Sequence, residues 1–273
     1  MSGVVGLSVL LPGLSVSAQT NEARARAPIA TVFSLNRTLS KVRSTNADGS
    51  ESIDPASFRW TYGLTLVAGG STGWSGEFGL TGYADSAQKN PGSADFSYVI
   101  GYRPASFTRV KFGYDNYGAN QFRPDRSRGE SVTSPSNGVW AATFKLNESS
   151  AIPDWMKLHA SSRLGCSAGP RYQRRYSDEN GARRQDRFFL RLSCQYVFYR
   201  HLFLTLDTNF FQAQRQFPGD ADFTWEFGWN AYAHRSFAVL YRNYAANRFP
   251  WRSSKRSPRW RDGTLTLQWR LLW

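Results

Sequence analysis

The chain has 273 residues, a formal net charge of +14 and a mean hydropathy of -0.49. A bundle of transmembrane helices is excluded, because each helix needs roughly 20 consecutive apolar residues and the chain has no such run. Aromatic residues make up 15% of the sequence. This is a high content for a soluble domain, and interfacial girdles of aromatic side chains would account for it.

The start of the chain predicts export. Val4 to Val16 is apolar but too short to span a membrane, and Val16-Ser17-Ala18 forms a small-residue cleavage pattern. We therefore expect a signal peptide over 1–18, a short periplasmic lead over 19–28 and one folded domain over 29–273. No Lys or Arg precedes the apolar part, which leaves a misplaced start codon or a buried N-terminal strand as alternatives. For an exported protein the positive charge indicates acidic solutes or lipopolysaccharide phosphates, and no nucleic acid is expected as a partner.

From residue 29 onward, segments of alternating apolar and polar residues follow one another. In the segment that starts at Phe58, large apolar side chains alternate with Arg59, Thr61, Gly63 and Thr65. A period of two is typical of a strand with one apolar and one polar face. The segments that show it, the first only weakly, are 29–42, 58–67, 74–84, 96–102, 108–114, 140–146, 156–166, 188–198, 202–210, 223–229, 237–244 and 262–273.

The connections between these segments alternate between short turns and long charged loops. The last segment ends in Trp269-Arg-Leu-Leu-Trp273, and this ending resembles the terminal aromatic assembly signal of Gram-negative outer-membrane β-barrels. The resemblance to that porin-like class implies an all-β fold: a single antiparallel up-and-down transmembrane barrel of about twelve strands. It also implies short periplasmic turns, long extracellular loops, contact with outer-membrane lipid and lipopolysaccharide, and recognition of Trp269 and Trp273 by the barrel assembly machinery. A soluble β-sandwich is the alternative.

If the apolar parity faces lipid, the other parity lines the lumen, where basic residues outnumber Glu77, Asp115, Asp207 and Glu226. The predicted basic lining is Arg59, Arg103, Arg109, Lys111, Lys145, Lys157, Arg163, Arg187, Arg191, Arg242 and Arg270. Arg and Lys rings select anions in pores. The sequence thus favours a narrow passive channel for anionic or sugar-like solutes or an exported polysaccharide. The alternative is a non-conducting structural barrel that anchors an envelope assembly.

One tract occurs twice. Tyr-Asp-Asn-Tyr-Gly-Ala-Asn-Gln-Phe at 114–122 matches Tyr-Arg-Asn-Tyr-Ala-Ala-Asn-Arg-Phe at 241–249, six strands away. Besides a shared alanine (Ala119 and Ala246), its shared positions are Tyr114, Asn116, Tyr117, Asn120 and Phe122, and Tyr241, Asn243, Tyr244, Asn247 and Phe249. Tyr and Asn can bind sugars, and the tract faintly resembles segments of exopolysaccharide-secretion barrels. The other interpretation is a girdle tyrosine followed by a turn at the mouth.

Cys166 and Cys194 lie on consecutive predicted strands, with the same parity and symmetric about residue 180. An antiparallel hairpin closed there sets them opposite each other, so we expect a cross-strand disulfide in an oxidising periplasm.

His159 and Ser161 form a His-x-Ser pair like that of outer-membrane lipid hydrolases, with the spacing for a base to activate a hydroxyl. The pair falls on the predicted polar parity and lacks the Asn and Gly context of those enzymes. Lipid hydrolysis is therefore only a minor alternative, and we expect no enzyme, no metal site and no cofactor.

Overall fold

The structure is a computed structural model that describes most of the chain from residue 29 onward. The described residues are 29–39, 43–45, 51–53, 60–70, 72–84, 94–117, 120–124, 132–147, 152–174, 176–177, 183–184, 186–212, 216, 221–230, 236–243, 247–249, 251 and 263–272. The expected signal peptide and lead lie outside them, as do Arg59, Tyr244 and Trp273. No helix in the described part of the chain is long and apolar enough to cross a membrane.

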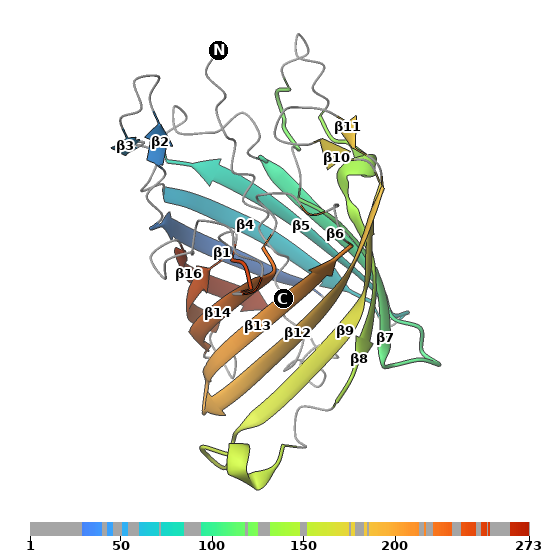
Figure 1. Ribbon diagram of the computed structural model, residues 1–273, viewed down its shortest axis with the longest axis vertical. Helices are drawn as coiled ribbons and strands as arrows, with labels where there is room; N and C mark the ends of the chain where they lie inside the picture. The colour runs from blue at the N-terminus through green and yellow to red at the C-terminus, as the bar shows by residue number, and fades with distance from the viewer. Residues whose placement is uncertain are drawn as a thin grey trace.

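Twelve antiparallel strands close into one barrel (Figure 1). Each strand pairs with the barrel strands before and after it in the chain, and the first pairs with the last. The barrel strands are β1 (Ile29–Thr38), β4 (Trp60–Gly69), β5 (Trp74–Tyr83), β6 (Phe96–Tyr102), β7 (Val110–Asn116), β8 (Val139–Lys145), β9 (Arg163–Gln173), β12 (Arg187–Tyr199), β13 (Leu202–Phe211), β14 (Phe223–Asn230), β15 (Ser236–Asn243) and β16 (Thr264–Leu272). The predicted fold class, a single antiparallel up-and-down barrel, is confirmed.

Short elements occupy some of the connections. One hairpin joins β2 (Arg43–Thr45) to β3 (Glu51–Ile53), and another joins β10 (Tyr176–Ser177) to β11 (Arg183–Arg184). The described parts of the connections also contain the 3-10 turns η4 (Pro135–Asn137) and η5 (Asp154–Met156).

The seam between β1 and β16 is the join on which closure depends. Its register runs without a break from Ala30 opposite Leu272 to Thr38 opposite Thr264. The first predicted strand, whose alternation is the weakest, is therefore a full member of the barrel. Pairing on both sides leaves it no free edge that would favour aggregation.

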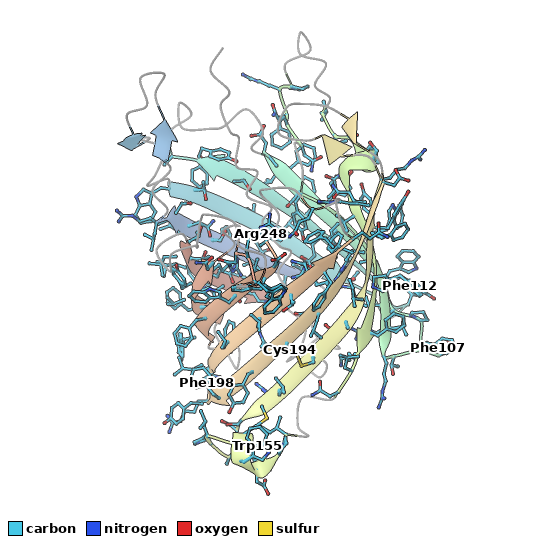
Figure 2. All side chains as sticks on the ribbon, viewed as in Figure 1. Phe107, Phe112, Trp155, Cys194, Phe198 and Arg248 are labelled. Atoms are coloured by element: carbon cyan, nitrogen blue, oxygen red, sulfur yellow. A yellow bond between two sulfur atoms is a disulfide. The ribbon has the colours of Figure 1, made fainter. Side chains whose placement is uncertain are left out.

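The two faces of the wall differ as the alternation predicts. On β16, Leu265, Leu267 and Trp269 are exposed, while Thr266 and Gln268 between them are buried. Trp269 is 59% exposed and Trp140, on β8, is 57% exposed. Phe112 and Phe107 project away from the barrel (Figure 2). A continuous outer surface of exposed aromatic and aliphatic side chains is the arrangement of transmembrane barrels, whose outward residues meet lipid.

The connections at one end of the barrel are shorter than those at the other, with the exception of 146–162. At the end where β1 begins and β16 finishes, called here the short-turn end, the connections are 70–73, 103–109, 146–162, 200–201 and 231–235. At the opposite, long-loop end they are 39–59, 84–95, 117–138, 174–186, 212–222 and 244–263.

One predicted strand begins later than expected. The alternation places its start at Met156, but β9 begins at Arg163, and 152–162 forms a connection that contains η5. The backbone N–H of Lys157 donates to the Asp154 carbonyl in this 3-10 turn, and the Tyr196 hydroxyl donates to the Met156 carbonyl. Backbone groups used in this way are not available to a sheet ladder, so the apolar periodicity here does not make a strand.

Candidate functional site

With the exception of Arg37 on β1, the charged side chains of the described barrel strands lie in the lumen, because they occupy the strand positions that alternate with the exposed apolar ones. The inward basic residues of the described strands are Lys111, Lys145, Arg163, Arg171, Arg187, Arg191, Arg242 and Arg270, and the inward acids are Glu77, Asp115, Asp207 and Glu226. These eight bases and four acids give a ratio of two to one, lower than the sequence predicted.

The difference comes from Arg59, which lies outside the described residues, and from Arg103, Arg109 and Lys157 at the short-turn end. Lys157 does not line the lumen: it is exposed beside η5, where its ammonium lies 2.6 Å from the Asp154 carboxylate and lowers the pKa of that carboxyl. Arg109 is also exposed, and with Arg103 it lies in the turn between β6 and β7.

Arg171 is the lumen residue that the sequence analysis missed. It lies on β9 beyond Pro170, a residue that normally marks a strand end because it has no N–H to donate. The ladder between β8 and β9 has no pair at Pro170, yet it continues on both sides, with Ala141 opposite Arg171 and Phe144 opposite Ala168. The part of β9 nearest the long-loop end is therefore part of the barrel wall.

Ion pairs form a belt in the half of the lumen toward the long-loop end. Arg191 lies 2.7 Å from Asp207, Arg171 lies 3.9 Å from Asp115, and Arg242 pairs with Glu226. The side chains of the first two pairs are between 10% and 27% exposed, so they reach the space inside the barrel without being fully solvated. Pairing is what such a position requires, because an uncompensated charge there is costly.

The basic surplus gathers toward the short-turn end. Lys145 and Arg163 are the terminal residues of β8 and β9 at that end, and Lys111 and Arg270 lie within two positions of it. No inward acid of the described strands lies as close to this end. The electrostatic potential of the lumen is therefore expected to become more positive toward the short-turn end.

Part of the lumen at the same end is packed with apolar side chains. Val197, Phe203, Ala238 and Leu240 form a cluster in which each residue is at most 5% exposed. Gly228 lies between Phe203 and Leu240 in the same cross-strand row. A Cβ at Gly228 would come within 2.7 Å of Leu240 and 3.1 Å of Phe203, so the glycine makes room for both side chains. Any passage is thus displaced toward the charged wall of β5 to β9.

The first copy of the repeated tract fastens a long loop to the rim of the barrel. Asn116 is fully buried and donates to the hydroxyls of Tyr98 and Tyr114. Asn120, also fully buried, donates to the Asn116 side chain at 3.1 Å. The Phe122 N–H donates to the Asp95 carboxylate at 3.1 Å. We call Asp95, Asn116, Asn120 and Phe122 the first clasp.

A second clasp repeats this geometry on the opposite wall. Asn247 donates to Asn243 at 3.2 Å, and the Phe249 N–H donates to the Asp222 carboxylate at 2.9 Å. In each clasp the N–H of the Asp donates to the carbonyl of the second Asn at 2.7 Å. The Arg248 guanidinium lies 3.5 Å from Asp222 and is seen near the middle of the barrel in projection (Figure 2). The second clasp is thus Asp222, Asn243, Asn247 and Phe249.

The aspartates of the clasps lie in a second, shorter repeat of the sequence. Ala-Asp-Phe occurs at 94–96 and again at 221–223. The spacing between copies is the same for the aspartates (222 − 95 = 127) as for the tyrosines (241 − 114 = 127). Because the Asn side chains are buried and bonded within the chain, the clasps have a structural role, and these groups are not presented to a sugar.

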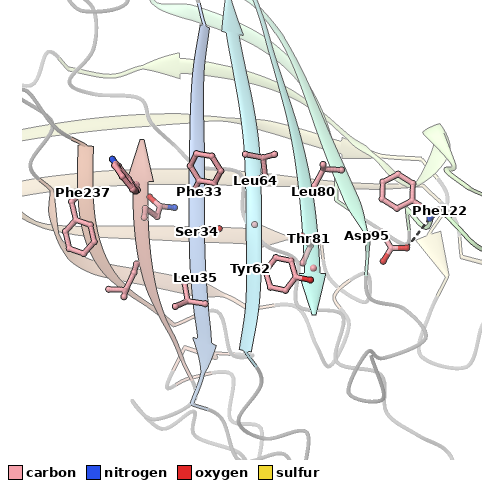
Figure 3. Close-up of a pocket in the computed structure, with 15 residues that line it drawn as sticks. Phe33, Ser34, Leu35, Tyr62, Leu64, Leu80, Thr81, Asp95, Phe122 and Phe237 are labelled. Atoms are coloured by element: carbon pink, nitrogen blue, oxygen red, sulfur yellow. Dashed lines mark hydrogen bonds between the residues drawn. The ribbon is translucent and has the colours of Figure 1, made fainter. Parts of the chain in front are cut away.

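The first clasp borders an open apolar groove on the outer face of the wall (Figure 3). The groove has a volume of about 650 Å³ and is lined by apolar side chains of β1, β4, β5, β15 and β16, among them Phe33, Tyr62 and Leu80. Phe122 of the clasp closes one end and stacks on Phe96 at 5.1 Å. The groove faces away from the lumen and belongs to the exposed apolar outer surface.

The two cysteines lie directly opposite each other on β9 and β12, in the predicted register. They form a disulfide with 4.2 Å between the Cα atoms, and Figure 2 shows the sulfur atoms at Cys194. The bond links the two strands that carry Arg171 and Arg191.

His159 and Ser161 do not lie on a strand, which corrects the parity argument made from the sequence. They lie in the connection before β9, where His159 Nδ1 and the Ser161 hydroxyl oxygen are 2.8 Å apart. The same oxygen accepts the backbone N–H of Arg200 at 3.0 Å, and the His159 ring packs edge-on against Tyr199. The pair therefore joins two connections at the short-turn end. Among the described residues, no group of three metal-ligating side chains is placed to hold a metal ion.

Comparisons with known proteins give low similarities. The sequence matches no protein-family model and no curated protein. Among solved structures, an outer-membrane channel from Pseudomonas putida F1 is 12% identical with a TM-score of 0.41, covering 90% of this chain and 96% of its own. The TodX monoaromatic hydrocarbon channel, in a deletion mutant, is 10% identical with a TM-score of 0.34 over 99% of this chain and 97% of its own. Salmonella typhi OmpF in complex with daunomycin is 10% identical, with a TM-score of 0.36 over 90% and 97%. These values are too low to argue from, and the barrel architecture rests on the strand pairing described above.

Proposed function

We propose that this protein is a passive channel of a Gram-negative outer membrane, with a narrow lumen that favours anions. The observation that carries the proposal is the twofold surplus of inward basic over inward acidic residues in a closed barrel with an apolar exterior. The selectivity is assigned to Lys111, Lys145, Arg163 and Arg270, because they lie nearer the short-turn end than any inward acid of the described strands. Clusters of Lys and Arg around a pore lower the barrier for anions and raise it for cations.

The membrane environment is argued from the exterior. Exposed aromatic and aliphatic side chains cover the outward positions of the strands, and lipid is the surrounding in which such a surface is stable. With the short turns in the periplasm, the long basic loops would face lipopolysaccharide, whose phosphates they can neutralise. The barrel assembly machinery is the proposed partner in insertion. The solute class extends to acidic or sugar-like molecules and to an exported polysaccharide.

A non-conducting structural barrel is the second candidate. The apolar cluster of Val197, Phe203, Ala238 and Leu240 favours it, because these inward side chains fill lumen space that an open pore would leave to water. In this role the barrel would anchor or complete an envelope assembly, such as an exopolysaccharide-secretion complex.

Lipid hydrolysis by His159 and Ser161 is the third candidate, and the 2.8 Å contact between them is the observation in its favour. Ser161 is already used to accept the Arg200 N–H, a structural role that explains the geometry without catalysis. Turnover of phospholipid that disappears in Ser161→Ala would establish the hydrolase.

Insertion of the purified protein into planar bilayers separates the first two candidates. The channel predicts discrete ohmic current steps in symmetric KCl. Insertion that is verified by protease protection but gives no current at any voltage would favour the structural barrel.

A further inference from the structure

Two stacked aromatic rings lie on the inner wall apart from Phe203 of the apolar cluster, although most aromatic residues of the strands face outward. Phe189 on β12 and Phe211 on β13 are cross-strand neighbours at inward positions near the long-loop end. Their rings stack with centroids 4.9 Å apart. Both are half-buried, so part of the pair remains accessible from inside the barrel.

Arginines surround this pair. Arg171 is the direct cross-strand neighbour of Phe189 on the side away from Phe211. The Arg187 guanidinium lies 5.7 Å from the centroid of each ring and donates to Gln173 at 2.8 Å, which holds it over the rings. Arg191 follows two positions beyond Phe189 on the same strand face. A flat apolar surface therefore adjoins guanidinium groups on three sides.

The Arg171 side chain retains hydrogen-bonding capacity. Its terminal nitrogens contact Asp115 at 3.9 Å and the Thr143 hydroxyl at 3.3 Å, and its Nε is buried without a hydrogen-bond partner among the described residues. Arg171 also interacts electrostatically with Arg191, a like charge. An arriving anion would offset part of this repulsion by contacting the terminal nitrogens of Arg171, beside Asp115 and Asp207.

We propose that Phe189, Phe211, Arg171 and Arg191, called the ring patch, form a specificity site for anions that carry a planar aromatic ring. The aromatic ring of the solute packs against the exposed part of the Phe189 and Phe211 rings. A carboxylate of the same solute binds the guanidinium groups beside them. Contact between aromatic rings contributes binding free energy beyond that of the buried apolar area, and this contribution requires a π system. The patch is therefore expected to bind aromatic rings more tightly than saturated rings. Charge-assisted hydrogen bonds to the carboxylate discriminate acids from neutral analogues.

This inference rests on the proposed channel function, and its test uses chloride current through single channels as the readout. Benzoate, cyclohexanecarboxylate and benzyl alcohol are added at the long-loop side. Half-block of the chloride current is expected at a benzoate concentration about threefold to tenfold lower than for cyclohexanecarboxylate, the range given by one aromatic contact. Benzyl alcohol is expected to block least.

Matched variants assign the effect to the patch. Phe189→Leu/Phe211→Leu should remove the preference for benzoate while leaving chloride conductance and anion selectivity intact. Phe210→Leu, on the neighbouring outward position, should behave as wild type. Arg191→Gln/Asp207→Asn removes both charges of an ion pair together and should weaken block by benzoate and cyclohexanecarboxylate alike.

The outcomes separate failure of the patch from failure of the channel. Equal block by benzoate and cyclohexanecarboxylate in a conducting, anion-selective wild-type channel would overturn the ring patch and leave the channel standing. If wild-type protein carries no current, isothermal titration of the detergent-solubilised barrel with the same acids replaces the block experiment. A preference for benzoate that Phe189→Leu/Phe211→Leu abolishes would support the patch, and its absence would overturn it.

Discussion

Asp115 on β7 and Arg171 on β9 reach toward each other inside the barrel, with 3.9 Å between a carboxylate oxygen and a guanidinium nitrogen. Their strands are not adjacent, since β8 lies between them. The pair therefore spans the inner face of an intervening strand, beside the small residue Ala141. Together with Arg191–Asp207 and Arg242–Glu226 it belongs to a belt of balanced charge. The proposed anion selectivity comes from the basic surplus nearer the short-turn end.

The pair of Glu226 and Arg242 should stabilise the barrel only as a pair. Glu226→Gln leaves Arg242, whose side chain is 9% exposed, without its carboxylate, and a loss of about 3 kcal/mol is expected. Glu226→Leu/Arg242→Met removes both charges and should recover most of that stability. Urea titration of barrels folded into lipid vesicles measures both effects. Equal loss in the single and the double variant would contradict the expectation.

The disulfide should stabilise the folded barrel by restricting the unfolded chain. Cys166 and Cys194 enclose a separation of 28 residues, for which chain entropy predicts roughly 3–4 kcal/mol. Cys166→Ser/Cys194→Ser should therefore lower the urea midpoint and keep the barrel. Alkylation followed by mass spectrometry of the native protein is expected to find no free thiol. Two free thiols in oxidised wild-type protein would refute the bond.

The clasps should protect the long loops from protease. Asn120→Ala and Asn247→Ala each break a buried side-chain network, at an expected cost of about 1–3 kcal/mol. Each variant should accelerate cleavage in its own loop only, at 117–138 or 244–263, when folded barrels in vesicles are treated with trypsin. Thr72→Ala, in an exposed turn at the opposite end, serves as the control. Cleavage rates equal to wild type would show that the clasps do not hold the loops.

The sequence predicts the strand number and the two faces because lipid outside and water inside impose the same alternation on every strand. Closure by the weak first strand follows from the same reasoning. The prediction is wrong at 156–162, where Met156 and Leu158 continue the apolar alternation of a strand but lie in a connection. The sequence also does not predict Arg171 as a lumen residue, because Pro170 before it is a usual marker of a strand end. Ion pairing between β7 and β9 depends on three-dimensional tilt and on the intervening small residue, which periodicity does not report.

The apolar cluster in the lumen should limit conductance. Phe203→Ala and Leu240→Ala each remove a buried side chain and are expected to cost about 2–5 kcal/mol of stability. If the cluster narrows the water-filled path, the double variant should also raise single-channel conductance. The outward substitution Leu204→Ala on the same strand should leave conductance unchanged. Unaltered conductance in the double variant would place the path elsewhere in the barrel.

The reversal potential of single channels in a KCl gradient tests the anion preference most directly. Wild-type barrels are expected to reverse at a potential of the sign that marks chloride permeation. The preference should fall in Lys111→Gln/Lys145→Gln and persist in Lys157→Gln, whose charge lies outside the lumen. A wild-type channel that favours potassium would contradict the proposed anion selectivity. A chloride preference that Lys111→Gln/Lys145→Gln leaves unchanged would contradict its assignment to the basic residues near the short-turn end.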